Sequence, residues 1–256
     1  MNDGFEGEPG GRPPPTPSLV IPLNVPPNER KLVGTLLTRK PAAISSTVAL
    51  LTAVVVTTMT LVGWYVPWFG ELLPVSGEQV FSLHQWWRPW SACFAHADVA
   101  HLLSNLFLFV IFGRFLSGHF GEWIFPFWAF VLGGVANLMV LPSYPAQVSV
   151  LGASGVVNVL GGMWLALFFL ISRQYTMGGR ILRTLGVALV LFAPQEFRPN
   201  VAERVHASGL LCGLVFGCGW FFVFKEKIRS YEIWETIRID DPEDDLPPPE
   251  GVEVVH

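Results

Sequence analysis

The stretch STVALLTAVVVTTMTLVGWYVPW, residues 46–68, decides the fold class because it contains no charged residue over its whole length. An α-helix needs about 20 apolar residues to cross a bilayer, so this run predicts a membrane-spanning helix. It begins too far along the chain and is too long to be the apolar region of a secretory signal peptide, and no small-x-small cleavage site follows it before the next polar stretch. We therefore expect an integral membrane protein.

The composition of the whole chain points the same way. Of its 256 residues, 51% are hydrophobic and only 14% are charged, whereas soluble domains carry roughly 25% charged residues. The three cysteines are odd in number and lack CxxC spacing, which favours neither a disulfide framework nor a zinc site. The net charge of −4 comes largely from an acidic cluster at residues 240–245. No basic patch interleaved with aromatic residues indicates nucleic acid binding.

Six apolar segments follow one another along the chain, separated by charged, Pro-rich or Gly-rich joints. They are residues 46–68, 100–116, 121–141, 154–172, 181–193 and 205–224. The sequence therefore predicts an all-α membrane protein with six transmembrane helices and a membrane domain at residues 44–224. The fifth segment is short and contains Arg183, whose side chain could extend to the membrane surface.

The two ends of the chain differ from the membrane domain. Residues 1–43 are rich in Pro and Gly and poor in aromatic residues, so they bury too little apolar surface to offset the entropy of ordering. We predict a disordered tail there and an acidic tail at residues 225–256. If the N-terminus is cytoplasmic, thirteen of the sixteen Lys and Arg residues lie on the inner side. The positive-inside rule then places both termini in the cytoplasm.

The loop between the first two spans, residues 64–94, is rich in tryptophan. Aromatic rings with a polar group prefer the headgroup region of a membrane. We expect this loop to lie in the outer membrane interface, where a membrane-anchoring role accounts for most of its aromatic residues.

Polar side chains within spans are candidates for function because their burial in lipid is costly. His101 and Asn105 are four residues apart and share one face of the second span. Ser154 begins the fourth span and His206 begins the sixth. The even-numbered spans all run from outside to inside in this topology, so the four side chains are expected at one depth near the outer surface.

Ser154 lies in the sequence GASG, residues 152–155. Small residues permit a tight bend and a close approach of substrate, and a helix start offers unsatisfied N–H groups that suit a developing oxyanion. A small-residue packing surface between helices is the alternative. A serine hydroxyl needs a base to accept its proton, and His206 could be that base. The alternative for His206 is a core histidine bonded to a backbone carbonyl.

Three glycines follow His206 at short, regular intervals, namely Gly209, Gly213 and Gly217. Such a stripe lets membrane helices approach closely. The sequence predicts that the sixth span packs on the glycine-containing fourth span, which would bring Ser154 and His206 within reach of each other.

His101 and Asn105 carry donors suited to an oxyanion hole, although an interhelical hydrogen-bonding pair is an equal alternative. Asp98 is an ordinary N-cap for the second span. A metal site of His96, Asp98, His101 and His206 is disfavoured, since His96 and His101 are off a shared helical face and HExxH is missing. We expect neither a metal nor a cofactor.

These motifs together resemble the rhomboid intramembrane serine proteases. The resemblance covers residues 45–224 and rests on Trp87-Arg88, His96-x4-His101-x3-Asn105, Gly152-Ala153-Ser154-Gly155 and His206-x2-Gly209-x3-Gly213. It implies a six-helix core with a water-filled cavity open to the outside and cleavage of single-span membrane proteins near the outer membrane boundary.

The resemblance also implies roles for individual residues. Ser154 would be the nucleophile and His206 the base and acid, while His101 and Asn105 would be oxyanion donors. The loop before the nucleophile would hold the substrate as an extended strand. Its substrate-binding residues are expected to be Gln147, Val148, Ser149 and Gly152.

Two positions depart from the family pattern. Ser117 stands where relatives often have a glutamate, which affects a buried structural hydrogen bond. Asn158 stands where many relatives have an aromatic residue that packs on the histidine. Because Asn158 lies one turn below Ser154 on the same helical face, it could hydrogen-bond His206 instead.

Two other classes of protein compete with an active protease. An inactive rhomboid-like protein would bind membrane clients without cutting them, but such relatives typically lose the serine or the histidine. A transporter would show an internal repeat with interrupted helices, and none is visible. The lack of a targeting presequence favours a plasma membrane or bacterial inner membrane.

Overall fold

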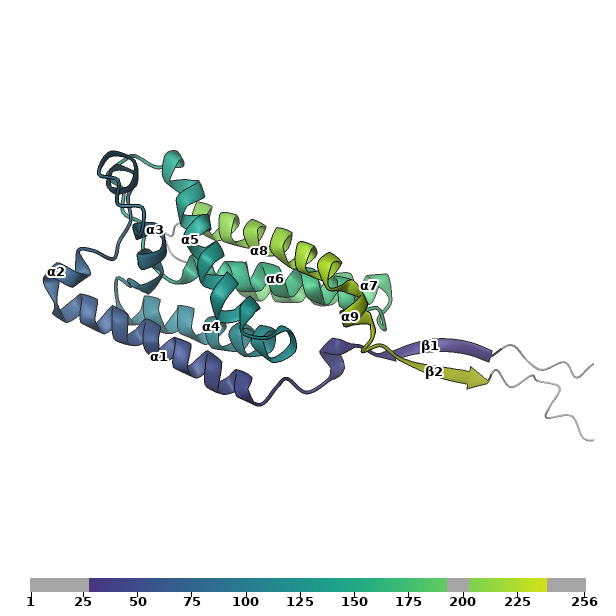
Figure 1. Ribbon diagram of the computed structural model, residues 1–256. Coiled ribbons are helices and arrows are strands. Elements are labelled where there is room, and N and C mark those ends of the chain that lie inside the picture. The colour runs from purple at the N-terminus through teal and green to yellow at the C-terminus, as the bar shows by residue number, and fades with distance from the viewer. Residues whose placement is uncertain (1–27, 193–202, 239–256) are drawn as a thin grey trace, which may run out of the picture. The chain divides into compact units, whose positions relative to one another are not determined.

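The computed structural model describes residues 28–192 and 203–238 (Figure 1). Residues 31–235 form one compact unit, and the described residues 28–30 and 236–238 are grouped outside it. In chain order the elements are β1 (Asn28–Gly34), η1 (Leu36–Thr38), α1 (Ile44–Tyr65), α2 (Pro67–Gly70), η2 (Glu78–Ser82), α3 (Arg88–Ser91), η3 (Ala92–Phe94), α4 (Val99–Phe120), η4 (Trp123–Trp128), α5 (Ala129–Val140), η5 (Leu141–Ser143), α6 (Ser154–Ile171), α7 (Met177–Phe192), α8 (Glu203–Val223), α9 (Lys225–Arg229) and β2 (Ile233–Arg238).

Five helical stretches of the described chain are long and apolar enough to cross a membrane. They are Ile44–Tyr65, Val99–Phe120, Trp123–Ser143, Ser154–Ile171 and Glu203–Val223. These match the first four predicted spans and the sixth, so the prediction of an all-α, multi-pass membrane protein is confirmed.

The predicted fifth span corresponds to α7, and its residue 193 lies outside the described residues. The 16 residues of α7 rise only about 24 Å at 1.5 Å per residue, less than the roughly 30 Å of a hydrocarbon core. The count of six spans therefore stays a prediction.

Helix α6 is the central helix of the bundle. Its most apolar stretch is 72% buried inside the protein, against 22% for α1. It packs against α4, α5, α7 and α8, and Figure 1 shows it running alongside α8. A helix that is apolar on all sides is expected in this position because it has no polar face to expose.

Glycines bring α6 and α8 into backbone contact. A Cβ atom on Gly213 would lie 2.1 Å from the carbonyl oxygen of Val159, and one on Gly162 would lie 2.4 Å from that of Leu210. A side chain at either position would force the helices apart. The predicted packing of the sixth span on the fourth is therefore confirmed, and it depends on glycine in both helices.

The predicted disorder of residues 1–43 is wrong for its last part. Strand β1 pairs with β2 in a two-stranded sheet, and Leu32 and Leu36 are buried. The prediction included this part because the residues before it are rich in proline. Strand β2, which pairs with β1, lies about 200 residues later in the chain. Residues 1–27 and 239–256 of the predicted tails lie outside the described residues.

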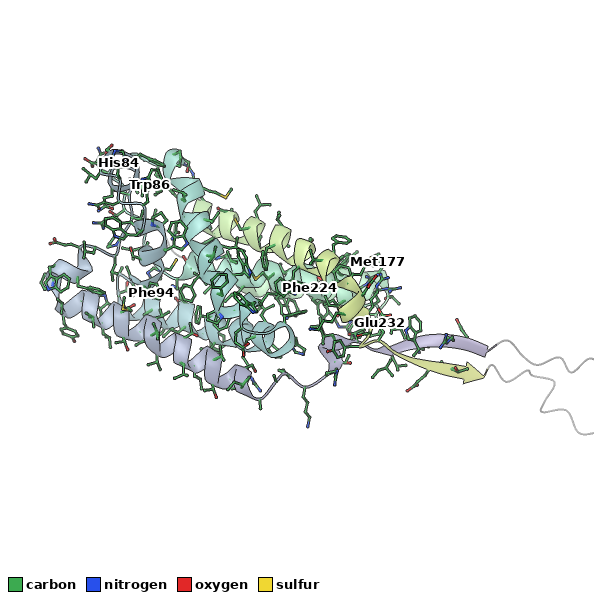
Figure 2. The ribbon with its side chains drawn as sticks, viewed as in Figure 1. His84, Trp86, Phe94, Met177, Phe224 and Glu232 are labelled. Carbon is green, nitrogen blue, oxygen red and sulfur yellow. The ribbon has the colours of Figure 1, made fainter. Side chains whose placement is uncertain are left out.

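The loop between α1 and α4 is structured by one buried arginine. Arg88 is only 5% exposed, and its Nη1 donates to the carbonyl oxygens of Glu71 and Pro74 at 2.8 and 2.9 Å. Burial lowers the pKa of Arg88. Figure 2 shows His84 and Trp86 of this loop at one end of the bundle, away from Met177 and Phe224 at the other end.

Candidate active site

The predicted site residues come from the starts of three helices. Ser154 is the first residue of α6, His101 is the third of α4, and His206 is the fourth of α8. Figure 1 shows α4, α6 and α8 beginning at the same end of the bundle. The helix starts that carry these three residues therefore lie at the same end of the bundle.

The imidazole of His101 lies against the turn that precedes Ser154. A Cβ atom on Gly152 would be 2.8 Å from Cε1 of His101 and 3.8 Å from Oγ of Ser154. Gly152 also has a φ of +119°, a conformation that side chains rarely adopt. Gly152 is thus required both by its backbone conformation and by the close approach of the His101 ring.

The first turns of α6 and α8 pack directly on each other. A Cβ atom on Gly209 would lie 2.6 Å from the carbonyl oxygen of Gly155, and one on Gly155 would lie 3.2 Å from Cγ1 of Val205. His206 is buried, with 5% of its surface exposed, whereas Ser154 is partly exposed. The structure thus brings the helical turns that carry Ser154 and His206 together.

Asn105 lies one turn further along α4 and is buried. Its Nδ2 donates to the carbonyl oxygen of His101 at 3.1 Å. The predicted N-cap is confirmed, because the carboxylate of Asp98 accepts from the His101 N–H at 2.7 Å. Asn105 is therefore near His101, but its amide is engaged within its own helix.

The loop before α6 is fixed on one side by the loop between α1 and α4. Val150 and Val75 exchange two backbone hydrogen bonds of 2.7 and 3.0 Å, and the N–H of Gly152 donates to the carbonyl of Ala92 at 2.9 Å. The side chains just before this bridge are exposed, namely Gln147, Val148 and Ser149. They lie in the loop that precedes Ser154, and their role in substrate binding stays a prediction.

His96 holds the turn before Ser154 in place, a contact that the sequence analysis missed. Its Nε2 accepts a hydrogen bond from the N–H of Ala153 at 3.2 Å, and its Nδ1 contacts Oγ1 of Thr60 at 2.9 Å. Because Thr60 donates its proton to the carbonyl of Phe94, it accepts from Nδ1–H of His96. Both ring nitrogens then have fixed roles in a neutral imidazole.

Burial lowers the pKa of His96 to about 4, in agreement with this neutral form. The sequence did contain a signal, since His96 lies five residues before His101 and is close to the helix start. The sequence analysis considers His96 only as a metal ligand. Its partners Thr60 and Ala153 are too distant in the sequence to be recognised from residue spacing.

Comparison with known proteins identifies the family. Residues 83–226 match the family model of the Rhomboid domain, which is more than half of the chain. This protein belongs to the rhomboid family. All of the predicted site residues lie within the matched region.

Two curated relatives of this rhomboid share part of its sequence. It is 33% identical over 135 residues to a chloroplastic rhomboid-like protein 11 of Arabidopsis thaliana. It is 28% identical over 170 residues to a rhomboid-like protease 3 of Toxoplasma gondii. These alignments cover 52% and 64% of this chain, and 43% and 61% of the relatives. The chain thus spans less than two thirds of either relative.

Proposed function

We propose that this rhomboid is an intramembrane serine endopeptidase that cleaves single-span membrane proteins near the outer membrane boundary. The observation that carries the proposal is the packing of the Val205–Gly209 turn of α8 on the first turn of α6. Ser154 begins that turn of α6 and is partly exposed, whereas His206 is buried. An accessible hydroxyl beside a sheltered imidazole is the minimum for acyl transfer.

In the proposed reaction, His206 accepts the proton of the Ser154 hydroxyl as Oγ attacks the carbonyl carbon of the scissile peptide bond. The tetrahedral intermediate collapses when His206 passes that proton to the leaving amine, which leaves an acyl-enzyme on Ser154. Water, deprotonated by the same imidazole, then releases the second product. The chemistry uses protein groups and water alone.

The oxyanion would be stabilised at the head of α6. Its first backbone N–H groups lack partners within the helix, and the ring of His101 lies beside the turn before Ser154. Asn105 would contribute if Nδ2 exchanged the His101 carbonyl for the substrate oxygen.

The substrate would bind in extended form along residues 147–152. The Val75 bridge fixes one edge of this loop at Val150, and the exposed side chains of Gln147, Val148 and Ser149 precede it. An extended segment can add its backbone to a strand edge. A helical substrate must in any case unwind before its amide can be attacked.

The distribution of Lys and Arg supports an orientation with both termini in the cytoplasm and the site towards the outer side of the membrane. Both tails would then face the cytoplasm. A cysteine introduced at Ser149 in a variant without Cys93, Cys212 and Cys218 should react with an impermeant maleimide added outside intact cells. Reaction only after the cells are opened would refute this orientation.

The activity itself is tested with a fluorophosphonate probe on the full chain in detergent. Wild type and Ser143→Ala, an exposed serine of η5, should be labelled equally. Ser154→Ala should abolish labelling, and His206→Ala should reduce it at least a hundredfold, in line with the usual contribution of a general base. Labelling that survives the Ser154 change would refute the assignment.

The same experiment separates an active protease from the inactive, client-binding alternative. A folded wild-type protein that neither reacts with the probe nor cleaves any single-span reporter, yet retains such reporters on purification, would establish the alternative.

A further inference from the structure

Two buried polar atoms at the α6–α8 contact have no hydrogen-bonding partner among the described residues. They are Oδ1 of Asn158 and Nδ1 of His206. Asn158 is 1% exposed and His206 is 5% exposed. A buried polar atom without a partner is costly, so native structures nearly always satisfy it with protein or with an ordered water.

The two atoms are chemically complementary. The amide of Asn158 donates through Nδ2 to the carbonyl oxygen of Ser154 at 2.9 Å. That bond fixes the orientation of the amide, because a carbonyl oxygen only accepts, so Oδ1 is left as an acceptor. Nδ1 of a neutral histidine is a donor when the proton is on that nitrogen.

The packing of the helices places Asn158 against the turn of α8 that follows His206. Asn158 is one helical turn after Ser154, and its Cβ atom would lie 3.2 Å from a Cβ atom on Gly209. Gly209 follows His206 by three residues and lies on the same side of α8. Any residue larger than glycine at that position would stand between Asn158 and α8.

We propose that Asn158 is a positioning residue for His206. One buried water bridges the two atoms: it accepts from Nδ1–H of His206 and donates to Oδ1 of Asn158, which leaves Nε2 without a proton. Nε2 is then the atom that accepts the proton of Ser154. Asn158 thereby joins both partners of the dyad, since Nδ2 also holds the Ser154 carbonyl. The catalytic consequence rests on the proposed function, but the hydrogen bond does not.

A second asparagine provides the matched control. Asn137 of α5 also has a buried Oδ1 without a partner in the described part of the chain. However, Oδ1 of Asn137 would lie 3.4 Å from a Cβ atom on Gly155, which would also contact Val205. The Nδ2 of Asn137 donates to the carbonyl oxygen of Pro89 at 2.8 Å. The packing therefore favours Asn158 as the partner of His206.

The hydrogen bond is tested by NMR of the full chain with ¹⁵N-labelled histidine in detergent micelles, without any need for activity. The signals of His206 are identified by their loss in His206→Ala. Wild type should show His206 protonated on Nδ1, with slow exchange of that proton. In Asn158→Leu the Nδ1 resonance should shift and exchange at least tenfold faster, whereas Asn137→Leu should leave it unchanged. A proton on Nε2 in wild type, or an unchanged resonance in Asn158→Leu, would overturn the proposal.

Kinetics test the consequence for catalysis. Asn158→Leu should lower the rate of probe labelling about tenfold or more. Asn158→Asp keeps an acceptor for His206 but loses the bond to the Ser154 carbonyl, and it should retain the rate within about threefold. Equal losses in the two variants, at equal melting temperature, would show that Asn158 acts only through Ser154. If wild type itself does not react with the probe, the proposed function fails, while the NMR result still decides the hydrogen bond.

Discussion

Replacement of Gly213 by alanine tests the close contact of α6 and α8. Its Cβ atom would lie 2.1 Å from the carbonyl oxygen of Val159, where real Cβ atoms essentially never come within 3.0 Å of a neighbour. The helices must therefore separate by about 0.9 Å at this level. Overpacking of this kind costs roughly 1–3 kcal/mol, against a gain of about 1 kcal/mol from the higher helix propensity of alanine.

The matched control is Gly219→Ala on the same helix. No described atom lies within 4 Å of the position that its Cβ atom would take, so this change should be neutral or slightly stabilising. We expect Gly213→Ala to be about 2 kcal/mol less stable than Gly219→Ala, or on the order of 6 °C lower in Tm for a chain of this size. Thermal unfolding in detergent measures the difference.

The same pair of variants links stability to activity. Separation of the helices should move the turn of His206 away from that of Ser154, so probe labelling of Gly213→Ala should fall while Gly219→Ala reacts like wild type. Equal Tm values and equal labelling rates in the two variants would refute the conclusion that this backbone contact supports the site.

Three further predictions concern the surroundings of the site. His96 is neutral when folded, with a pKa of about 4 against 6.5 for an unperturbed histidine, so the unfolded chain takes up its proton first as the pH falls. The free energy of unfolding should therefore drop by up to about 3 kcal/mol between pH 6.5 and pH 4. In His96→Gln the free energy of unfolding, measured by denaturation at each pH, should fall less steeply over the same range. Arg88→Ala removes two hydrogen bonds to loop carbonyls and should destabilise the loop by about 3 kcal/mol; limited proteolysis should then cut within residues 66–94, and uncut protein would contradict this. Asp98→Ala should lower stability by about 1 kcal/mol through loss of the N-cap, whereas Asp98→Asn should retain it in the same unfolding assay.

Much of the fold follows from local features of the sequence. Long apolar runs define the spans, because a helix is the only way for a single segment to satisfy its backbone in lipid. The glycines of the sixth span predicted its partner, because close helix contact requires small residues. The N-cap at Asp98 follows from residue type and position alone.

The features that sequence analysis missed depend on contacts between distant segments. Strand β1 was predicted to be disordered because its partner β2 lies at the other end of the chain, and nothing local to residues 28–34 indicates that pairing. His96 was considered only as a metal ligand, since its actual partners, Thr60 and Ala153, come from two other segments. Spacing rules describe one helix at a time and do not reach such contacts.

The hydrogen bond between Ala153 and His96 has a consequence for inhibitor design. The amide N–H of Ala153 already donates to His96, so an inhibitor at the head of α6 could engage this amide only by displacing His96. Inhibitors shaped to engage three consecutive amides would gain nothing from the third. Compounds that extend towards His101 instead would meet the ring that lies against the turn before Ser154.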